Sequence, residues 1–243
     1  MKIIRHTDAD FARQCGKLTA PSSLFDPVIE ERTRAIVDAV RSRGDAALLE
    51  FTERFDGAQL TAEQLAVTQA ELFRASLKAD AELRAAIKTS SRNIERFARH
   101  GLRKNWSARN AQGAKVGEKF DPFQRVSIYI PGGTAPLVSS ALMTIVLARV
   151  AGCPEIVVCT PCNNTGEINA ALLFAMNTAG ATEIYRLVGA QAIAALAFGT
   201  RMIRRTQKVF GPGNAYVVAA KRLLFGHVAI DLLPGPSEVL VLA

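Results

Sequence analysis

Glycine-rich turns that directly follow apolar runs are the features of this chain best suited to chemistry. The first such turn is Pro131-Gly132-Gly133, which follows an apolar run ending at Ile130. Glycine can adopt positive φ and lets backbone amides approach a ligand closely. A helix that begins after such a turn offers free N–H groups and the positive end of its dipole. The turn therefore indicates a position for an anion or a polar ligand.

Three more turns of this kind occur further along the chain. They are Val188-Gly189-Ala190-Gln191, Gly211-Pro212-Gly213-Asn214 and Pro234-Gly235-Pro236-Ser237-Glu238. Ligands of open α/β sheets bind outside the carboxyl ends of the strands, where turns of this type lie. The four turns together predict a ligand-binding rim whose polar side chains are Tyr129, Gln191, Asn214 and Ser237.

Each turn also has a simpler interpretation when it is taken alone. Asn214 is a natural helix N-cap, Gln191 could face solvent, and Tyr129 could pack within a sheet. None of the turns is the dinucleotide fingerprint G-x-G-x-x-G. The turns alone therefore predict a site without establishing a cofactor.

Metal and acid–base chemistry have little support in the sequence. Cys159-Thr160-Pro161-Cys162 could be a redox pair or half of a zinc site, but the chain has no second C-x-x-C element. The three histidines are His6, His100 and His227, and none has a carboxylate neighbour at catalytic spacing. We expect neither a zinc site nor a histidine-based acid–base pair from these residues.

Short β-rich runs alternate with helix-length segments after Gln124. The expected strands are 125–130, 155–160, 183–187, 208–210, 227–231 and 239–242, and the expected helices are 135–151, 166–180, 191–198 and 214–225. This alternation predicts an α/β fold, with a Rossmann-like parallel sheet covered by helices on both faces.

The chain before this point is expected to be mainly helical. Apolar residues at three- and four-residue spacings predict helices that begin at Pro27, at 46, at 69 and at 79. The polar segment 102–124 predicts a short strand pair or an extended connector. We therefore expect a helical region 1–124 that contributes to a first α/β domain, a ligand-binding domain 125–236, and a return strand 237–243 into the first domain, which is left incomplete.

Composition limits the classes of protein that remain. The 243 residues are 49% hydrophobic and 21% charged, as in globular proteins. The net charge of +8 fits a basic surface or an anion-attracting cleft, because the basic clusters are short and no nucleic-acid-binding motif occurs. The longest apolar run, 135–150, is too short and polar to cross a bilayer. Few cysteines and no secretory signal favour a cytoplasmic protein without membrane or nucleic-acid partners.

The turns, taken with their order and spacing, resemble those of the histidinol dehydrogenase family. The resemblance rests on Tyr-Ile-Pro-Gly-Gly-Thr-Ala-Pro-Leu at 129–137, on 188–200, on Gly-Pro-Gly-Asn-Ala-Tyr-Val at 211–217 and on Gly-Pro-Ser-Glu-Val-Leu-Val at 235–241. The segments 43–48 and Phe55-Asp56 are similar to the leading helices of that family.

The resemblance implies a function and a set of binding residues. Members of the family use NAD and zinc to oxidise L-histidinol to L-histidine through histidinal, and they act as homodimers. Tyr129, Gln191 and Asn214 match the positions that contact NAD, and Ser237 matches a position that contacts substrate. The family's zinc ligands and its Glu-His acid–base pair follow the motif that ends at Leu242.

Two hypotheses follow for the chain. The first is an N-terminal portion of a histidinol dehydrogenase, which supplies the NAD side of the site but no catalytic or metal-binding residue. The alternative is a short, non-catalytic relative that acts as a nucleotide-binding or subunit-interaction module.

Overall fold

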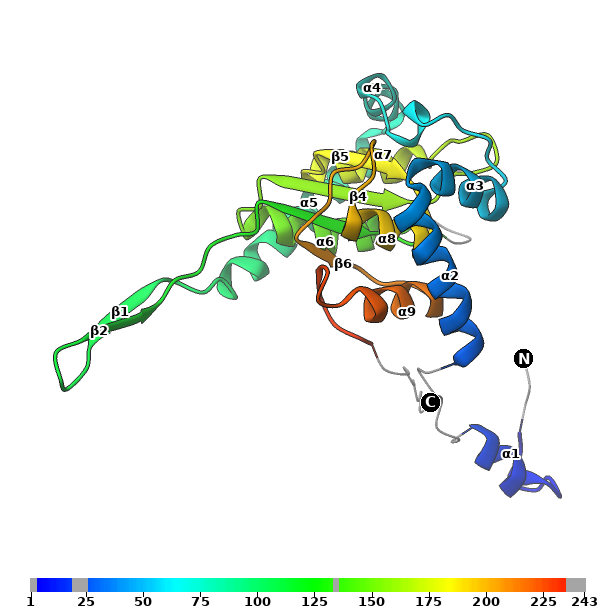
Figure 1. Cartoon of the computed structure of the whole chain (residues 1–243), viewed down its shortest axis with the longest axis horizontal. Helices are drawn as coiled ribbons and strands as arrows, with labels where there is room; N and C mark the ends of the chain where they lie inside the picture. The colour runs from blue at the N-terminus through cyan, green and yellow to red at the C-terminus, as the bar shows by residue number, and fades with distance from the viewer. Residues whose placement is uncertain (1–3, 19–25, 133–135, 235–243) are drawn as a thin grey trace.

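A five-stranded parallel sheet forms the centre of the computed structural model, which describes residues 4–18, 26–132 and 136–234 (Figure 1). The strand order is β5-β4-β3-β6-β7. The strands are β3 (Arg125–Tyr129), β4 (Glu155–Thr160), β5 (Glu183–Arg186), β6 (Lys208–Phe210) and β7 (Ala229–Ile230). All four pairings between neighbouring strands are parallel.

The strand order places a topological switch point between β3 and β6. From β3 the chain moves outwards to β4 and β5, and it then returns to the other side of β3 with β6 and β7. Connections on the two sides of such a switch leave the sheet on opposite faces, which opens a crevice at the carboxyl ends of the strands. The turns after β3 and β6 are therefore placed where a ligand would bind.

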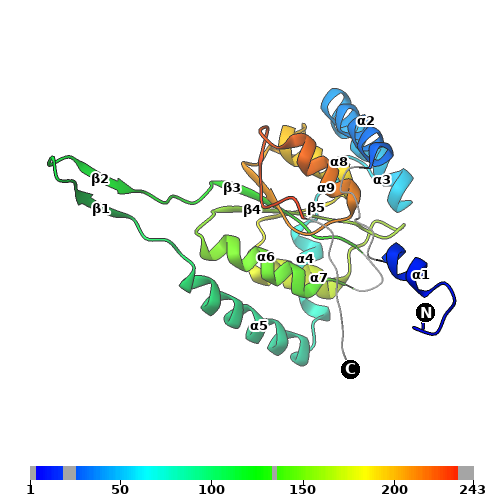
Figure 2. The ribbon, with the colours of Figure 1, turned by 90° about the horizontal axis from the view of Figure 1, so that it is seen from below.

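Helices cover both faces of the sheet, as the sequence predicts (Figure 2). One layer contains α6 (Val138–Val150) and α7 (Ala170–Ala179), with α4 (Gln69–Lys78) and α5 (Ala81–His100) outside them. The other contains α8 (Gly189–Phe198) and α9 (Ala215–Leu224), with α2 (Pro27–Arg43) and α3 (Asp45–Asp56) packed on them. Because both faces are covered, every residue of β3 is buried.

The N-terminal helices carry clear start signals. Asp26 caps α2, and Asp80 caps α5. Thr68 and Glu71 form a reciprocal capping box at the start of α4. Gly44, with φ of 56°, separates α2 from α3. These helices pack directly against the helices of the sheet, so the division of the chain at residue 124 stays a prediction.

Two elements lie away from the sheet. The segment 102–124 contains an antiparallel pair, β1 (Trp106–Arg109) and β2 (Lys115–Glu118), and all eight of these residues are exposed. This hairpin projects from the body of the molecule, and α1 (Phe11–Leu18) stands apart on another side (Figure 1). A short 3-10 turn, η1 (Glu63–Leu65), lies beside the free edge of β5.

Several element boundaries differ from those expected from the sequence. The helix expected at 166–180 begins at Ala170, because Asn169 caps it and Asn163 orders the preceding loop by accepting backbone hydrogen bonds from Thr165 and Glu167. The helix expected from 191 begins two residues earlier, at Gly189. The strand expected at 227–231 is limited to Ala229–Ile230. The strand expected at 239–242 lies outside the described residues.

Candidate functional site

Glycine is required in the turn after β6. Gly211 has φ of +120°, and a Cβ there would lie 2.2 Å from the carbonyl oxygen of Tyr129. A Cβ on Gly213 would lie 2.4 Å from a methyl group of Val217. The first glycine thus lets the ends of β6 and β3 approach each other, and the second lets the turn close onto α9.

A buried ion pair fixes the same turn. Lys221, which is 3% exposed, donates to the carbonyl oxygen of Gly211 at 2.6 Å and to Asp231 at 2.8 Å. Asp231 also accepts from the Gly211 amide at 2.9 Å. Partial burial works to raise the pKa of Asp231, but these hydrogen bonds outweigh burial and hold it below its usual value. Asp231 thereby connects the end of β7 to the turn after β6.

Asn214 caps α9 and lies on the rim of a cleft. Its Oδ1 accepts from the amides of Tyr216 at 3.1 Å and Val217 at 3.2 Å. The residue is exposed and lines the cleft described below. The capping role and a ligand-binding role are compatible, because capping uses only one end of the side-chain amide.

Tyr129 contacts the first turn of α8, the turn that carries Gln191. The Tyr129 hydroxyl, at the end of β3, accepts from the Gly189 amide at 3.1 Å, and burial raises the pKa of Tyr129 to about 12. Gln191, on the first turn of α8, is only 1% exposed. The interpretation of Gln191 as a solvent-exposed residue is therefore wrong, because α8 packs between the sheet and α2.

The Gln191 side chain has an unusual environment. Among the described residues, neither its Oε1 nor its Nε2 has a hydrogen-bond partner, and both atoms are buried. Burial of an unpaired amide opposes folding. Such a group is typical of a position that is kept for a ligand or an ordered water molecule.

Two helix starts at this end of the sheet have no side-chain cap. Asn169 and Asn214 cap α7 and α9, whereas α6 and α8 begin after Leu137 and Val188 without a side-chain hydrogen bond. These two helices follow β3 and β5. The first amide of each is already bonded, Val138 to the Pro136 carbonyl and Gly189 to the Tyr129 hydroxyl, so the later amides of each first turn are the ones that can donate to an anionic or polar ligand.

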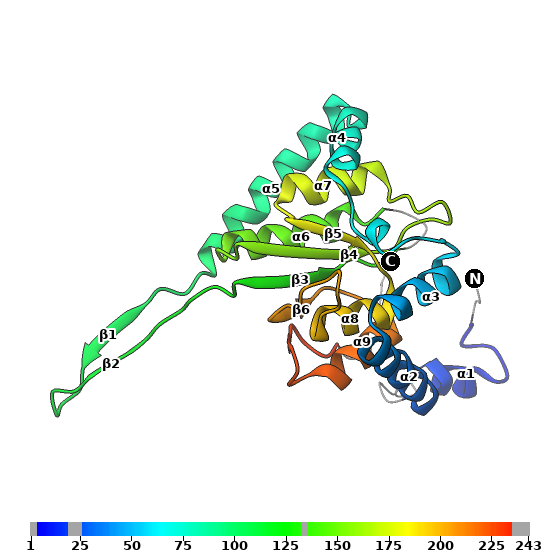
Figure 3. The same cartoon turned by 45° about the horizontal axis from the view of Figure 1, so that its top comes forward.

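A cleft of about 900 Å³ lies at the carboxyl ends of β3 and β4. These ends face the side of the molecule on which α3 lies (Figure 3). The cleft extends from Asn214 and Tyr129, past Gly132, to the end of β4 and the helices α4 and α7. Its volume is large enough for a sizeable organic ligand. Gly132 is also required here, because a Cβ would lie 2.3 Å from Pro161.

Arg186 secures the outer wall of the cleft. It is 5% exposed and donates to the carbonyl oxygens of Gly166 at 2.6 Å and of both Gln64 and Ala66 at 2.9 Å. It also pairs with Glu71 of α4. No local pattern in the sequence marks Arg186, because its partners Gln64, Ala66 and Glu71 lie more than a hundred residues away along the chain.

The cysteines of the C-x-x-C element are not activated thiols. Cys159 is buried, and burial holds its pKa far above the usual value. Burial also raises the pKa of Cys162 to about 11. Reactive cysteines usually have lowered pKa values, and burial shifts both of these thiols in the opposite direction.

Histidines contribute nothing to the cleft within the described part of the chain. His227 packs its ring against Phe198, before the amino end of β7, and His100 ends α5. In the same residues, no three His, Cys, Asp or Glu side chains are close enough to hold a metal ion. Ser237 and the rest of the fourth glycine turn lie outside the described ranges.

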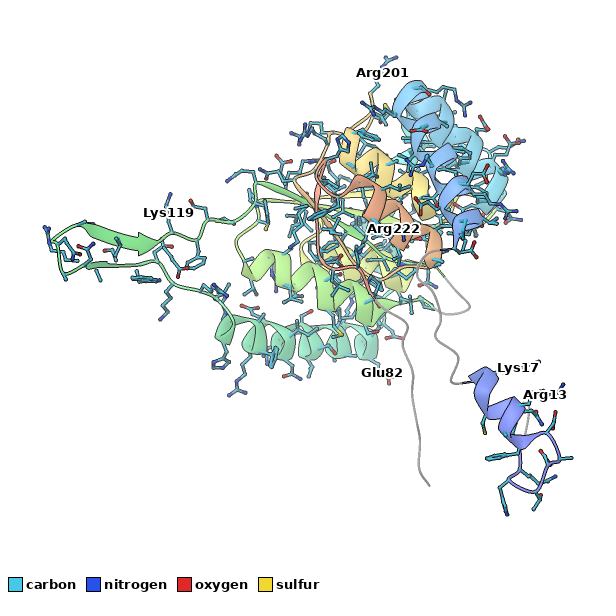
Figure 4. All side chains as sticks on the ribbon, turned by 60° about the horizontal axis from the view of Figure 1, so that its bottom comes forward. Arg13, Lys17, Glu82, Lys119, Arg201 and Arg222 are labelled. Atoms are coloured by element: carbon cyan, nitrogen blue, oxygen red, sulfur yellow. The ribbon has the colours of Figure 1, made fainter. Side chains whose placement is uncertain are left out.

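The basic side chains labelled in Figure 4 lie on separate elements, with Arg13 and Lys17 together on α1. Lys119 lies beside the hairpin, Arg222 on α9 and Arg201 on a distant loop (Figure 4). Arg222 is paired with Glu30 of α2 at 2.5 Å. No helix that the structure describes is both long enough and apolar enough to span a membrane.

The sheet order, the glycine turns and the cleft at the switch point define a Rossmann-like α/β ligand-binding unit. A family model described as histidinol dehydrogenase matches residues 22–243. The chain therefore belongs to the histidinol dehydrogenase family.

Individual relatives agree with this membership. The chain is 48% identical over 217 residues to a histidinol dehydrogenase of Geobacillus kaustophilus, covering 88% of this chain and 51% of that protein. It is 42% identical over 242 residues to that of Syntrophotalea carbinolica, covering 100% and 56%. The crystal structure of histidinol dehydrogenase from Elizabethkingia anophelis superimposes with a TM-score of 0.84 at 35% identity, covering 93% of this chain and 52% of that one. The chain thus spans about half the length of the relatives that it matches.

Proposed function

We propose that this chain supplies the NAD-binding side of a histidinol dehydrogenase, which oxidises L-histidinol to L-histidine through histidinal. The observation that carries the proposal is the cleft at the switch point between β3 and β6. Tyr129 and Asn214 line it. Gln191 is not part of its lining, but its buried, unpaired amide lies two residues after Gly189, whose backbone amide donates to the Tyr129 hydroxyl. The position of the cleft is the one that nucleotide cofactors occupy in open α/β sheets.

The residues present fit a dinucleotide. The required glycines of the turns allow close approach of the ligand, and the uncapped start of α6 suits a phosphate group. Gln191 can both donate to and accept from the ligand. When bound, NAD accepts the hydride that leaves the alcohol carbon. The role of the chain is to hold and orient that cofactor.

Other parts of the site are proposed from family membership alone. Ser237 is proposed to contact the substrate, and a zinc ion is proposed to be held by residues other than those described. A homodimer is the proposed assembly, and the cytoplasm is the proposed location. We further propose the domain division of 1–124, 125–236 and 237–243.

One observation favours the alternative of a non-catalytic nucleotide-binding or subunit-interaction module. No histidine among the described residues lines the cleft, so the histidine of the family's acid–base pair has no counterpart there. Turnover assays with L-histidinol, NAD and zinc separate the two functions. The dehydrogenase proposal expects NADH formation only when the acid–base and zinc residues of the family are present, and the module proposal expects none with any complement.

Calorimetric titration of the 243-residue chain with NAD tests the binding proposal. We expect saturable binding, weakened about tenfold by Asn214→Ala, because one good hydrogen bond is lost. Asp80→Ala is the matched control, since it removes an equivalent cap from α5 outside the cleft. Equal NAD affinity in the wild type and Asn214→Ala would contradict the assignment of Asn214.

A further inference from the structure

A second polar group of the cleft has no partner within the described residues. Asp56 is the last residue of α3 and lines the cleft. Its Oδ2 is buried without a hydrogen-bond partner, although the residue as a whole is partly exposed. An acceptor in this state costs stability unless a donor reaches it.

The position of Asp56 at the C-terminal end of α3 adds to the free-energy cost of its buried carboxylate. Carboxylates are unfavourable at the C-terminal end of a helix, where the dipole is already negative. Burial raises the pKa of Asp56 to about 6, with no cation to offset it. The position therefore serves neither helix stability nor an ion pair.

Thr160 is a second residue of the cleft lining whose buried polar atom has no hydrogen-bond partner among the described residues. It ends β4, lines the same cleft and is 1% exposed. Its Oγ1 is buried and unpaired among the described residues. Asp56 and Thr160 line this cleft together with Tyr129 and Cys162, around the carboxyl ends of β3 and β4.

The topology of the sheet indicates which ligand group could donate a hydrogen bond to Asp56 and Thr160. In dinucleotide-binding sheets, an acidic residue that follows the first glycine turn accepts a hydrogen bond from the adenosine ribose 2′-hydroxyl. Here the segment after β4 is Thr160-Pro161-Cys162-Asn163 and contains no acid. Asp56, at the end of α3, supplies a carboxylate to the lining of the same cleft instead.

We propose that Asp56 accepts a hydrogen bond from the adenosine ribose of the dinucleotide, with Thr160 as a second contact to the same diol. This inference rests on the proposed NAD-binding function and assigns the ribose end of that site. Asp56 is thereby a specificity-determining residue, since a carboxylate repels a ribose that carries a 2′-phosphate.

Calorimetry with NAD, NADP and an NAD analogue that lacks the adenosine 2′-hydroxyl tests the assignment on the full 243-residue chain. In the wild type, we expect the deoxy analogue to bind about tenfold more weakly than NAD, because a hydrogen bond to a charged acceptor is lost. We expect Asp56→Asn to bind NAD about tenfold more weakly, to lose most discrimination against the analogue and to bind NADP relatively better. Thr160→Val should weaken NAD binding severalfold.

Asp38→Asn, on the exposed surface of α2, is the matched control and should bind NAD as the wild type does. Equal NAD affinity of Asp56→Asn and the wild type would overturn the proposal while leaving NAD binding itself intact. Wild-type protein that binds no NAD would instead overturn the proposed function and this inference with it. If Asp56→Asn weakens binding of L-histidinol alone, Asp56 belongs to a substrate site and the ribose assignment is wrong.

Discussion

Gln191 places binding and stability in opposition at a single residue. Its amide is buried and unpaired within the described chain, and such burial costs about 1–2 kcal/mol. We expect Gln191→Met, which keeps the volume and removes the polar atoms, to raise the free energy of unfolding by that amount in the absence of ligand. The same variant should weaken NAD binding. Denaturant unfolding and calorimetry measure the two effects, and a destabilised variant would show that a buried water already satisfies the amide.

The carboxyl group of Asp56 also lowers the free energy of unfolding, by an amount that depends on pH. The pKa of its carboxyl is about 6 in the folded protein, above the ordinary value of 3.8. The folded state therefore binds a proton more tightly than the unfolded state, and the charged carboxylate opposes folding above pH 6. We expect Asp56→Asn to be more stable than the wild type by about 1–2 kcal/mol at pH 7, after allowance for partial exposure. The difference should vanish as pH falls from 6 to 4 in urea titrations; a constant difference would contradict this account.

The sequence predicts the structural role of a residue when the partners of that residue are close to it in the chain. Asn214 was predicted as a cap, because an N-cap bonds to amides two and three residues away. Tyr129 was predicted at a strand end from the neighbouring turn. The position of Asp56 in the lining of the cleft is not predicted by the sequence. Its place in the cleft depends on how α3 packs against the sheet, which no local pattern encodes.

At the scale of elements, Arg186 connects the edge of the sheet to the wall of the cleft. It joins β5 to η1, to the 163–168 loop and to α4. We expect Arg186→Met to lower the free energy of unfolding by about 3 kcal/mol, because it removes the cation that pairs with Glu71 and the donor to three carbonyl groups. Arg204→Met, which breaks an exposed pair with Glu155 at the other end of the strands, should cost less than about 1 kcal/mol. Equal losses in chemical denaturation would refute this ranking.

The alternation of strands and helices is predicted by the sequence because, like the helix caps, it depends on local patterns. The periodicity of 125–230 predicted every strand of the described sheet, with errors mainly at boundaries. The pairing of α2 and α3 with α8 and α9, and of α4 and α5 with α6 and α7, was not predicted. Each N-terminal helix is amphipathic, and many surfaces could bury its apolar side.

At the scale of the whole molecule, the hairpin adds nothing to the packed body. All eight residues of β1 and β2 are exposed, and the Trp106 side chain bonds only within the hairpin, to Glu118 at 2.7 Å. We expect replacement of residues 106–118 by a short glycine–serine link to leave the melting temperature unchanged within about 2 °C. A fall of several degrees in calorimetry would mean that the hairpin stabilises the body.

The position of α2 has a consequence for synthesis of the chain. Its Glu30 pairs with Arg222 of α9, and the two helices lie side by side although 192 residues separate this pair in sequence (Figure 1). At ribosomal rates of roughly 5–20 residues per second, α2 must wait on the order of 10–40 s before its partner emerges. During this time its apolar side is uncovered and open to wrong partners. Docking of α2 is therefore completed only after α8 and α9 have been synthesised.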